Sequence, residues 1–179
     1  MRDLSYRVAL GGIVSALCLT AMFFAGIIPA LYLLLPMIAG VLMMIIAVEV
    51  NTGWAWLTYI AVGLLSLFIT FDKEASLIFI MLFGHYPIIK FYLDRIKSRF
   101  FRNFIKLAVF NICAVSYFFV TVYIFGLDQM LEEFDEIGRY GSYIMLGLCN
   151  FIFVMYDLNL DMCNHMYRKK LMPRLKRKK

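Results

Sequence analysis

Charge is scarce in this sequence, and linker-like composition is missing from it. Only 17% of the residues are charged and 63% are hydrophobic, whereas a soluble domain is about a quarter charged and half apolar. The chain has 4 prolines and 11 glycines, and no stretch rich in Ser, Gly or Pro would separate two domains. These absences argue against a soluble protein and predict a single membrane domain over residues 1–179.

Patterns for metal binding and catalysis are also missing. The four cysteines are Cys18, Cys113, Cys149 and Cys163. They form no Cys-x-x-Cys pair and lie in or beside apolar runs, which is typical of small apolar helix residues. Only His85 and His165 are histidines, too few for a zinc motif. No nucleophile elbow, phosphate-binding loop or dinucleotide fingerprint occurs. We expect no enzymatic activity, no metal and no cofactor.

What the sequence does have is a series of apolar runs long enough to cross a bilayer as helices. About 20 residues of helix span the hydrocarbon core of a membrane. The first run is longer than the apolar core of a signal peptide, so we expect it to be retained. The fold class is therefore all-α, a bundle of six transmembrane helices. The predicted spans are residues 6–28, 31–50, 54–71, 75–93, 104–125 and 140–163, followed by a basic tail over 164–179.

Lys and Arg residues predict the orientation of this bundle. Placing both termini in the cytoplasm puts every one of the 18 basic residues except Lys73 and Arg139 on the inner side, as the composition of cytoplasmic loops requires. We therefore predict a multi-pass protein of the cell membrane. Contact with anionic membrane lipids then explains the net charge of +6, and we expect no nucleic-acid partner.

The first span carries small residues on one helical face. Ala9, Gly12, Ala16 and Thr20 follow one another at intervals of three or four residues, so they lie on the same side of a helix. Small residues allow close approach of another helix in lipid. The face has two interpretations of about equal weight, which are packing inside the bundle and contact with a partner protein.

Three consecutive charges, Asp72, Lys73 and Glu74, separate the third and fourth spans on the predicted outer side. The simpler interpretation is a solvated turn in which Asp72 caps the start of the fourth span. The negative charge of Glu74 then interacts favourably with the positive pole at the start of that helix. The alternative is that the turn lines an outward-facing site for a polar solute.

Polar residues inside the later spans need partners, because an ionised group in a bilayer is costly. Lys90 and Asp157 each lie near the inner end of their span, so we expect them at similar depth and able to form an ion pair, with a structural role favoured. For His85, the simpler interpretation is a hydrogen-bonded histidine in the interior, and the alternative is a metal ligand. Residues 126–139 alternate apolar and acidic residues at helical spacing, which predicts an amphipathic connector or a lid on the outer surface.

At this point the chain resembles a known family. The opening ALGGIVSALCLTAMFFAGIIPALYLLLP and the later FDKEASLIFIMLFGHYPIIK, within six predicted spans, are similar to the substrate-binding S-components of energy-coupling factor (ECF) transporters. In that family a small-xxx-small pattern of the first helix meets a membrane-embedded coupling subunit that works with ATPases. The resemblance assigns that contact to Gly12 and Ala16, with Gly where the family usually has Ala.

The resemblance also implies a function in vitamin or micronutrient uptake, with a small solute bound near the outer face. The implied substrate-binding residues are Asp72, Lys73, Glu74, Tyr117 and Asn150. No vitamin-specific signature is present, so the solute is left open. The alternative is an MreD-like membrane scaffold for cell-wall assembly, which is similar in size and span count and binds no small molecule.

Overall fold

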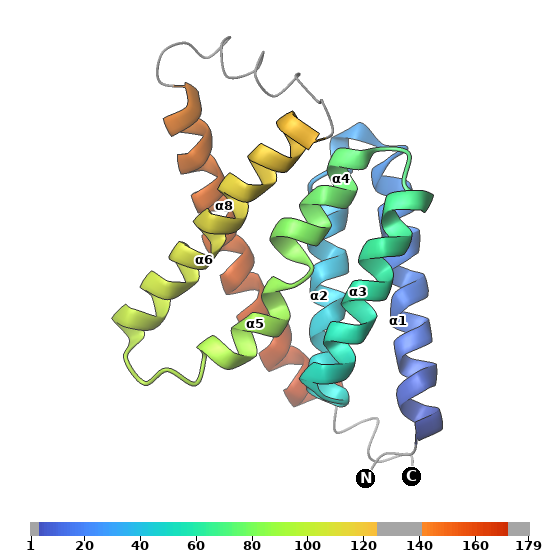
Figure 1. Cartoon of the computed structure of the whole chain (residues 1–179). Coiled ribbons are helices and arrows are strands. Elements are labelled where there is room, and N and C mark those ends of the chain that lie inside the picture. The colour runs from blue at the N-terminus through green and yellow to red at the C-terminus, as the bar shows by residue number, and fades with distance from the viewer. Residues whose placement is uncertain (1–3, 125–140, 172–179) are drawn as a thin grey trace.

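The computed structural model describes residues 4–124 and 141–171, and every regular element in that part of the chain is a helix (Figure 1). The all-α prediction is therefore confirmed. The α-helices are α1 (Leu4–Ala25), α2 (Leu34–Glu49), α3 (Thr52–Ile69), α4 (Lys73–Ile78), α5 (Tyr86–Leu93), α6 (Arg99–Phe119) and α8 (Gly141–Met166). A 3₁₀ turn, η1 (Pro29–Leu31), precedes α2, and three π-helical turns are η2 (Phe79–Phe83), η3 (Val120–Ile124) and η4 (Tyr167–Leu171).

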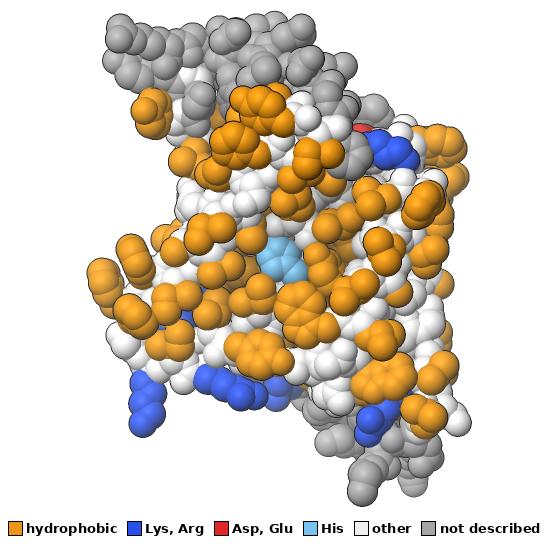
Figure 2. Space-filling model, in the orientation of Figure 1, with side chains coloured by type: hydrophobic (Ala, Val, Ile, Leu, Met, Phe, Trp, Pro, Cys, Tyr) orange, Lys and Arg blue, Asp and Glu red, His pale blue; other side chains and the backbone are white. Residues whose placement is uncertain are grey.

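By length and composition, five helical stretches can cross a membrane. They are Leu4–Ala25, Thr52–Ile69, Lys73–Leu93, Arg99–Ile124 and Tyr143–Lys170, and the shorter apolar helix is Leu34–Glu49. Large apolar side chains are exposed along these helices, as for Phe68 at 85% and Phe100 at 84%. Figure 2 shows apolar side chains covering most of one face, with most of the Lys and Arg side chains gathered at one end. Such a surface suits lipid rather than water.

The helices run up and down between two ends of the bundle (Figure 1). One end, called the Asp72 end, holds the turn between α3 and α4. The opposite end, called the Lys90 end, holds the connection between α5 and α6, the start of α1 and the end of α8. That the Lys90 end faces the cytoplasm stays a prediction.

Two apolar cores lie on either side of the fourth span. The first joins α1, α2 and α3 through small and medium residues such as Cys18, Ala39 and Val62. The second joins α6 and α8 to α2 and the fourth span through aromatic residues such as Phe110 and Tyr156. Residues of α4, η2 and α5 belong to both cores, so the fourth span is the central element of the molecule.

Two helices extend beyond the predicted spans. Helix α6 begins at Arg99, inside the stretch predicted to be a basic loop, because the Ser98 hydroxyl accepts a hydrogen bond from the Phe101 amide and caps the helix. Helix α8 and η4 continue to Leu171, so the predicted tail over 164–179 starts within a helix. The predicted amphipathic segment over 126–139 lies outside the described residues.

Candidate functional site

The fourth span is broken in the middle, and it is also the most enclosed span. Of its most apolar window, 67% is buried, against at most 28% for the other four long stretches. In η2 the Gly84 amide donates to the Phe79 carbonyl five residues earlier, at 2.7 Å. A Cβ at position 84 would lie 2.7 Å from that same carbonyl oxygen, so glycine is required there. Pro87, which lacks an amide hydrogen, sits in the first turn of α5, where no helical donor is missed.

Side chains from α3 on one side of the fourth span and from α8 on the other donate hydrogen bonds to the backbone carbonyls that this break exposes. Tyr59 of α3 donates to the Ile80 carbonyl at 2.6 Å, and Tyr156 of α8 donates to the Phe83 carbonyl at 3.1 Å. His85 also meets the Ile80 carbonyl through Nδ1 at 3.2 Å. Because lipid offers no hydrogen bonds, an irregular helix in a membrane needs such partners.

His85 lies apart from the predicted ion pair. A carbonyl can only accept, so its Nδ1 carries the hydrogen, and Nε2 accepts from the Cys113 thiol at 3.5 Å. The prediction of a hydrogen-bonded interior histidine describes its surroundings well. Among the described residues, no three His, Cys, Asp or Glu side chains are grouped to hold a metal ion.

The Lys90 end contains a network of buried charges. The structure brings Lys90 of α5 and Asp157 of α8 into direct ion-pair contact, as the sequence predicts. Tyr86 also donates to an Asp157 oxygen at 2.6 Å. Lys106 of α6, only 5% exposed, lies 3.2 Å from both Asp157 oxygens and 2.8 Å from Asp94. Asp157 thus joins three helices through one carboxylate.

Lys106 was not predicted to belong to this network. It is one of the basic residues assigned to the inner side, although it lies inside the predicted span 104–125. A lone cation within such a span requires an acidic partner nearby. That signal would have assigned it to Asp157, the carboxylate expected inside the last span.

Further carboxylates surround the two lysines. Asp161 lies 2.9 Å from Lys90, and Asp94 lies 3.9 Å from it. Arg102 reaches Asp94 at 4.0 Å through Nε. The network thus contains three cations and three carboxylates, so it is close to neutral and suited to burial. Its members are Lys90, Arg102, Lys106, Asp94, Asp157 and Asp161.

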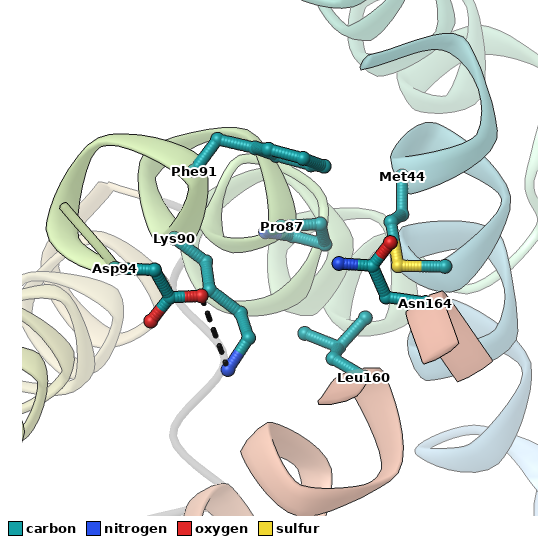
Figure 3. A pocket seen from close by; sticks show the side chains of 7 residues that line it. All are labelled: Met44, Pro87, Lys90, Phe91, Asp94, Leu160 and Asn164. Atoms are coloured by element: carbon teal, nitrogen blue, oxygen red, sulfur yellow. Dashed lines mark ion pairs between the residues drawn. The ribbon is translucent and has the colours of Figure 1, made fainter. Parts of the chain in front are cut away.

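Two cavities adjoin this network. One lies where α2, α5 and α8 meet, is lined by Lys90, Asp94 and Asn164, and has a volume of about 10 Å³ (Figure 3). That is room for roughly one water molecule among polar groups. The other, of about 150 Å³, lies between α6 and α8 on the far side of Asp157. Neither cavity is lined by Asp72, Lys73 or Glu74.

The charged turn at the Asp72 end caps two helices. The Asp72 carboxylate accepts from the Glu74 amide at 2.9 Å and begins α4. The Lys73 ammonium donates to the Leu67 and Thr70 carbonyls at 2.6 and 3.2 Å and so closes the end of α3. The capping interpretation therefore accounts for Asp72, and the contact of Lys73 with the end of α3 is a second cap that the sequence did not predict.

Tyr117 and Asn150, the deeper residues of the predicted substrate site, lie in different surroundings. Tyr117 is 6% exposed and lies near the end of α6 that points to the Asp72 end, one helical turn before Thr121 (Figure 1). The Tyr117 and Thr121 oxygens have no partner of hydrogen-bonding geometry among the described residues. Asn150 instead exchanges two hydrogen bonds with Asn111 of α6, at 2.8 and 3.0 Å. The structure thus buries Tyr117 toward the Asp72 end of α6 and engages Asn150 in a contact between helices (Figure 1).

The small-residue face of α1 points away from the bundle. Ala9, Gly12, Ala16 and Thr20 are all exposed, and nothing lies within 4 Å of a Cβ placed on Gly12. The inward side of α1 uses Val14, Cys18 and Met22 instead. Packing inside this bundle therefore does not explain the face formed by these small residues.

Comparison with known proteins gives no relative: no protein-family model, curated protein or solved structure matches this chain.

Proposed function

We propose that this chain is a membrane subunit similar to the S-components of ECF transporters. It captures a small solute at the Asp72 end and docks through α1 on a membrane-embedded coupling subunit powered by ATPases. The observation that carries the proposal is the small-residue face of α1, which the bundle leaves uncovered. In lipid, small residues favour helix contact because they allow close backbone approach.

The polar groups at the Asp72 end support the solute-binding part of the proposal. Tyr117 and Thr121 place two buried hydroxyls toward the Asp72 end of α6 and η3 (Figure 1). A buried hydroxyl without a partner loses free energy relative to one that is hydrogen-bonded, so a polar solute that bonds to it gains affinity. Asn150 has no part in this version of the site, because its amide is occupied by Asn111.

The docking part is tested by replacing Gly12 and Ala16 with Leu and measuring co-purification with ATPase-containing membrane complexes. We expect recovery to fall strongly, because the added side chains hold a partner helix away from α1. Gly147→Leu is the matched control, since Gly147 is exposed on α8 and a Cβ there meets nothing within 4 Å. Equal recovery of all variants would refute docking through α1.

The solute-binding part is tested by native mass spectrometry of the detergent-extracted protein. We expect a retained small molecule in the parent chain and its loss in Tyr117→Phe, which removes only the buried hydroxyl. Tyr143→Phe is the control because Tyr143 is 76% exposed. A parent chain that carries no small molecule, while docking through α1 is intact, would contradict solute capture alone.

The second candidate is the MreD-like scaffold for cell-wall assembly. The uncovered small-residue face of α1 and the basic residues gathered at the Lys90 end support it as well, because neither feature requires a solute (Figure 2). A scaffold also uses the α1 face, but its partner is a cell-wall protein. Identification of such a protein as the partner lost on Gly12→Leu, with no retained solute, would select this candidate.

A further inference from the structure

The larger cavity is a groove between α6 and α8. It is part neither of the proposed solute site at the Asp72 end nor of the proposed docking face of α1. Its polar lining consists of Asn103, Lys106 and Asp157, and its apolar lining includes Leu107, Phe153 and Val154. Asn103 and Val154 are exposed side chains at its margin, whereas Lys106 and Phe153 are buried at its floor. The groove therefore opens toward the surface that the apolar helices present to lipid.

Polarity changes along the groove in one direction. Asn103 precedes Lys106 and Leu107 in α6, which runs away from the Lys90 end, while Phe153 and Val154 precede Asp157 in α8, which runs toward it (Figure 1). Because the two helices run in opposite directions, Asn103 and Lys106 lie nearer the Lys90 end than Leu107, and Asp157 lies nearer it than Phe153 and Val154. Leu158, which follows Asp157, is an apolar lining residue beyond it. The same gradient, polar at the surface and apolar toward the middle, characterises one leaflet of a bilayer.

The surroundings of the polar end are positively charged. The network itself balances three cations with three carboxylates. Beyond it, Arg95, Lys97 and Arg99 are exposed at the α5–α6 connection, and the amino end of α6 adds the positive pole of a 21-residue helix. A phosphate group next to Asn103 would therefore lie in a favourable field.

We propose that this groove binds an anionic phospholipid of the leaflet at the Lys90 end. The phosphate lies at the Asn103 and Lys106 end, and one acyl chain lies along Leu107, Phe153 and Val154. The proposal rests on the placement of the helices in a membrane and is independent of any solute or coupling partner.

The size of the groove favours part of a lipid over a water-soluble ligand. At about 150 Å³ it is smaller than the roughly 300–1,000 Å³ pockets that enclose small molecules. An acyl chain needs only a narrow apolar channel open on one side, and each methylene removed from water or loose lipid contact adds dispersion contacts with the walls. The head group then stays at the membrane surface beside the basic residues.

The test uses the full chain purified in mild detergent, with native mass spectrometry to measure retained phosphatidylglycerol and phosphatidylcholine. We expect phosphatidylglycerol to be retained preferentially. In Val154→Trp, retention should fall about tenfold, because the indole occupies the path of the acyl chain. Val115→Trp is the matched control, since Val115 is exposed on α6 and does not line the groove.

A second variant tests the polar end and covers the case in which Val154→Trp does not fold. Asn103→Leu should weaken the preference for phosphatidylglycerol over phosphatidylcholine, whereas Asn159→Leu should not, because the Asn159 amide bonds only the Met155 carbonyl of its own helix. Equal retention in Val154→Trp and Val115→Trp, or equal retention of the two lipids by the parent, would overturn the proposal. Displacement of phosphatidylglycerol by inorganic phosphate alone would also overturn it, since the acyl chain would then contribute nothing.

Discussion

The half formed by α1, α2 and α3 and the half formed by α6 and α8 are held together by different forces. In the first half the fully buried side chains of α1, α2 and α3 are small or aliphatic, with Trp54, Trp56 and Tyr59 packed at the margin, and close approach of the helices contributes to stability. In the second half, aromatic rings and a buried charge network join the helices. The difference teaches that helix pairing within one bundle can depend on close packing in one half and on paired charges in the other. Substitutions in the two halves should therefore fail in different ways.

The largest effect is expected at the centre of the charge network. Replacing Asp157 with Ala leaves Lys90 and Lys106 without their shared carboxylate, and we expect a loss of about 3–5 kcal/mol in the free energy of unfolding. Reversible unfolding in mixed micelles measures this loss. Asp161→Asn is the control, because Asp161 is 56% exposed and an exposed pair is worth about 0–1 kcal/mol. Similar losses in both variants would mean that the network has no specific centre.

The next effect tests packing where the halves meet. A Cβ at Gly40 of α2 would collide with the Tyr156 hydroxyl and lie 2.5 Å from the Phe83 carbonyl oxygen. Gly40→Ala should therefore destabilise the protein by about 1–3 kcal/mol through overpacking. It should also displace the Tyr156 hydroxyl from the Phe83 carbonyl. The same unfolding assay measures the loss, and an unchanged stability would show that α2 and α8 are not in close contact.

A smaller effect is expected from the amide pair in the second half. Asn111 and Asn150 form two reciprocal hydrogen bonds between α6 and α8. A double-mutant cycle with Leu at each position should give a coupling free energy of about 0.6–1.7 kcal/mol, the range measured for polar pairs in membranes. Combining Asn111→Leu with Asn159→Leu should give no coupling, because Asn159 bonds within its own helix. Coupling in that control cycle would mean that the effect is not specific to the pair.

The smallest effect, and one of opposite sign, is expected on the outside of the first half. Because nothing lies near a Cβ on Gly12, Gly12→Ala should leave stability unchanged or raise it by up to about 1 kcal/mol through helix propensity. Thermal unfolding of the isolated chain measures this change. A clear loss of stability would mean that Gly12 is covered within the bundle after all.

Sequence reasoning reached the charge pair because the physical constraint on it is strong. Lys90 and Asp157 lie in apolar runs near the same end, and a charge in lipid must be compensated. Asp161, four residues after Asp157 in the same run, was missed. The helical spacing of the small residues on α1 was equally visible. Whether that face turns inward or outward was not, because spacing defines a face but not its neighbour.

The broken fourth span was less accessible. Pro87 disfavours a regular helix at its position, but the sequence does not show that η2 inserts a wider turn before Gly84. That geometry depends on distant donors, Tyr59 and Tyr156, which make the exposed carbonyls tolerable. Likewise, Asn150 looked like a residue available to a solute, and only the structure pairs it with Asn111.

The two tyrosines at the broken span also constrain how the protein moves. Tyr59 comes from the half formed by α1, α2 and α3, and Tyr156 comes from the half formed by α6 and α8. Each hydroxyl donates to a backbone carbonyl of the fourth span. Sliding α8 along the fourth span would leave the Phe83 carbonyl without its Tyr156 partner, at a cost of several kcal/mol in hydrocarbon, whereas the Ile80 carbonyl would keep its contact with His85 if Tyr59 moved away. Both halves are thus hydrogen-bonded to the fourth span. A rearrangement that keeps these two bonds must move the two halves together with that span.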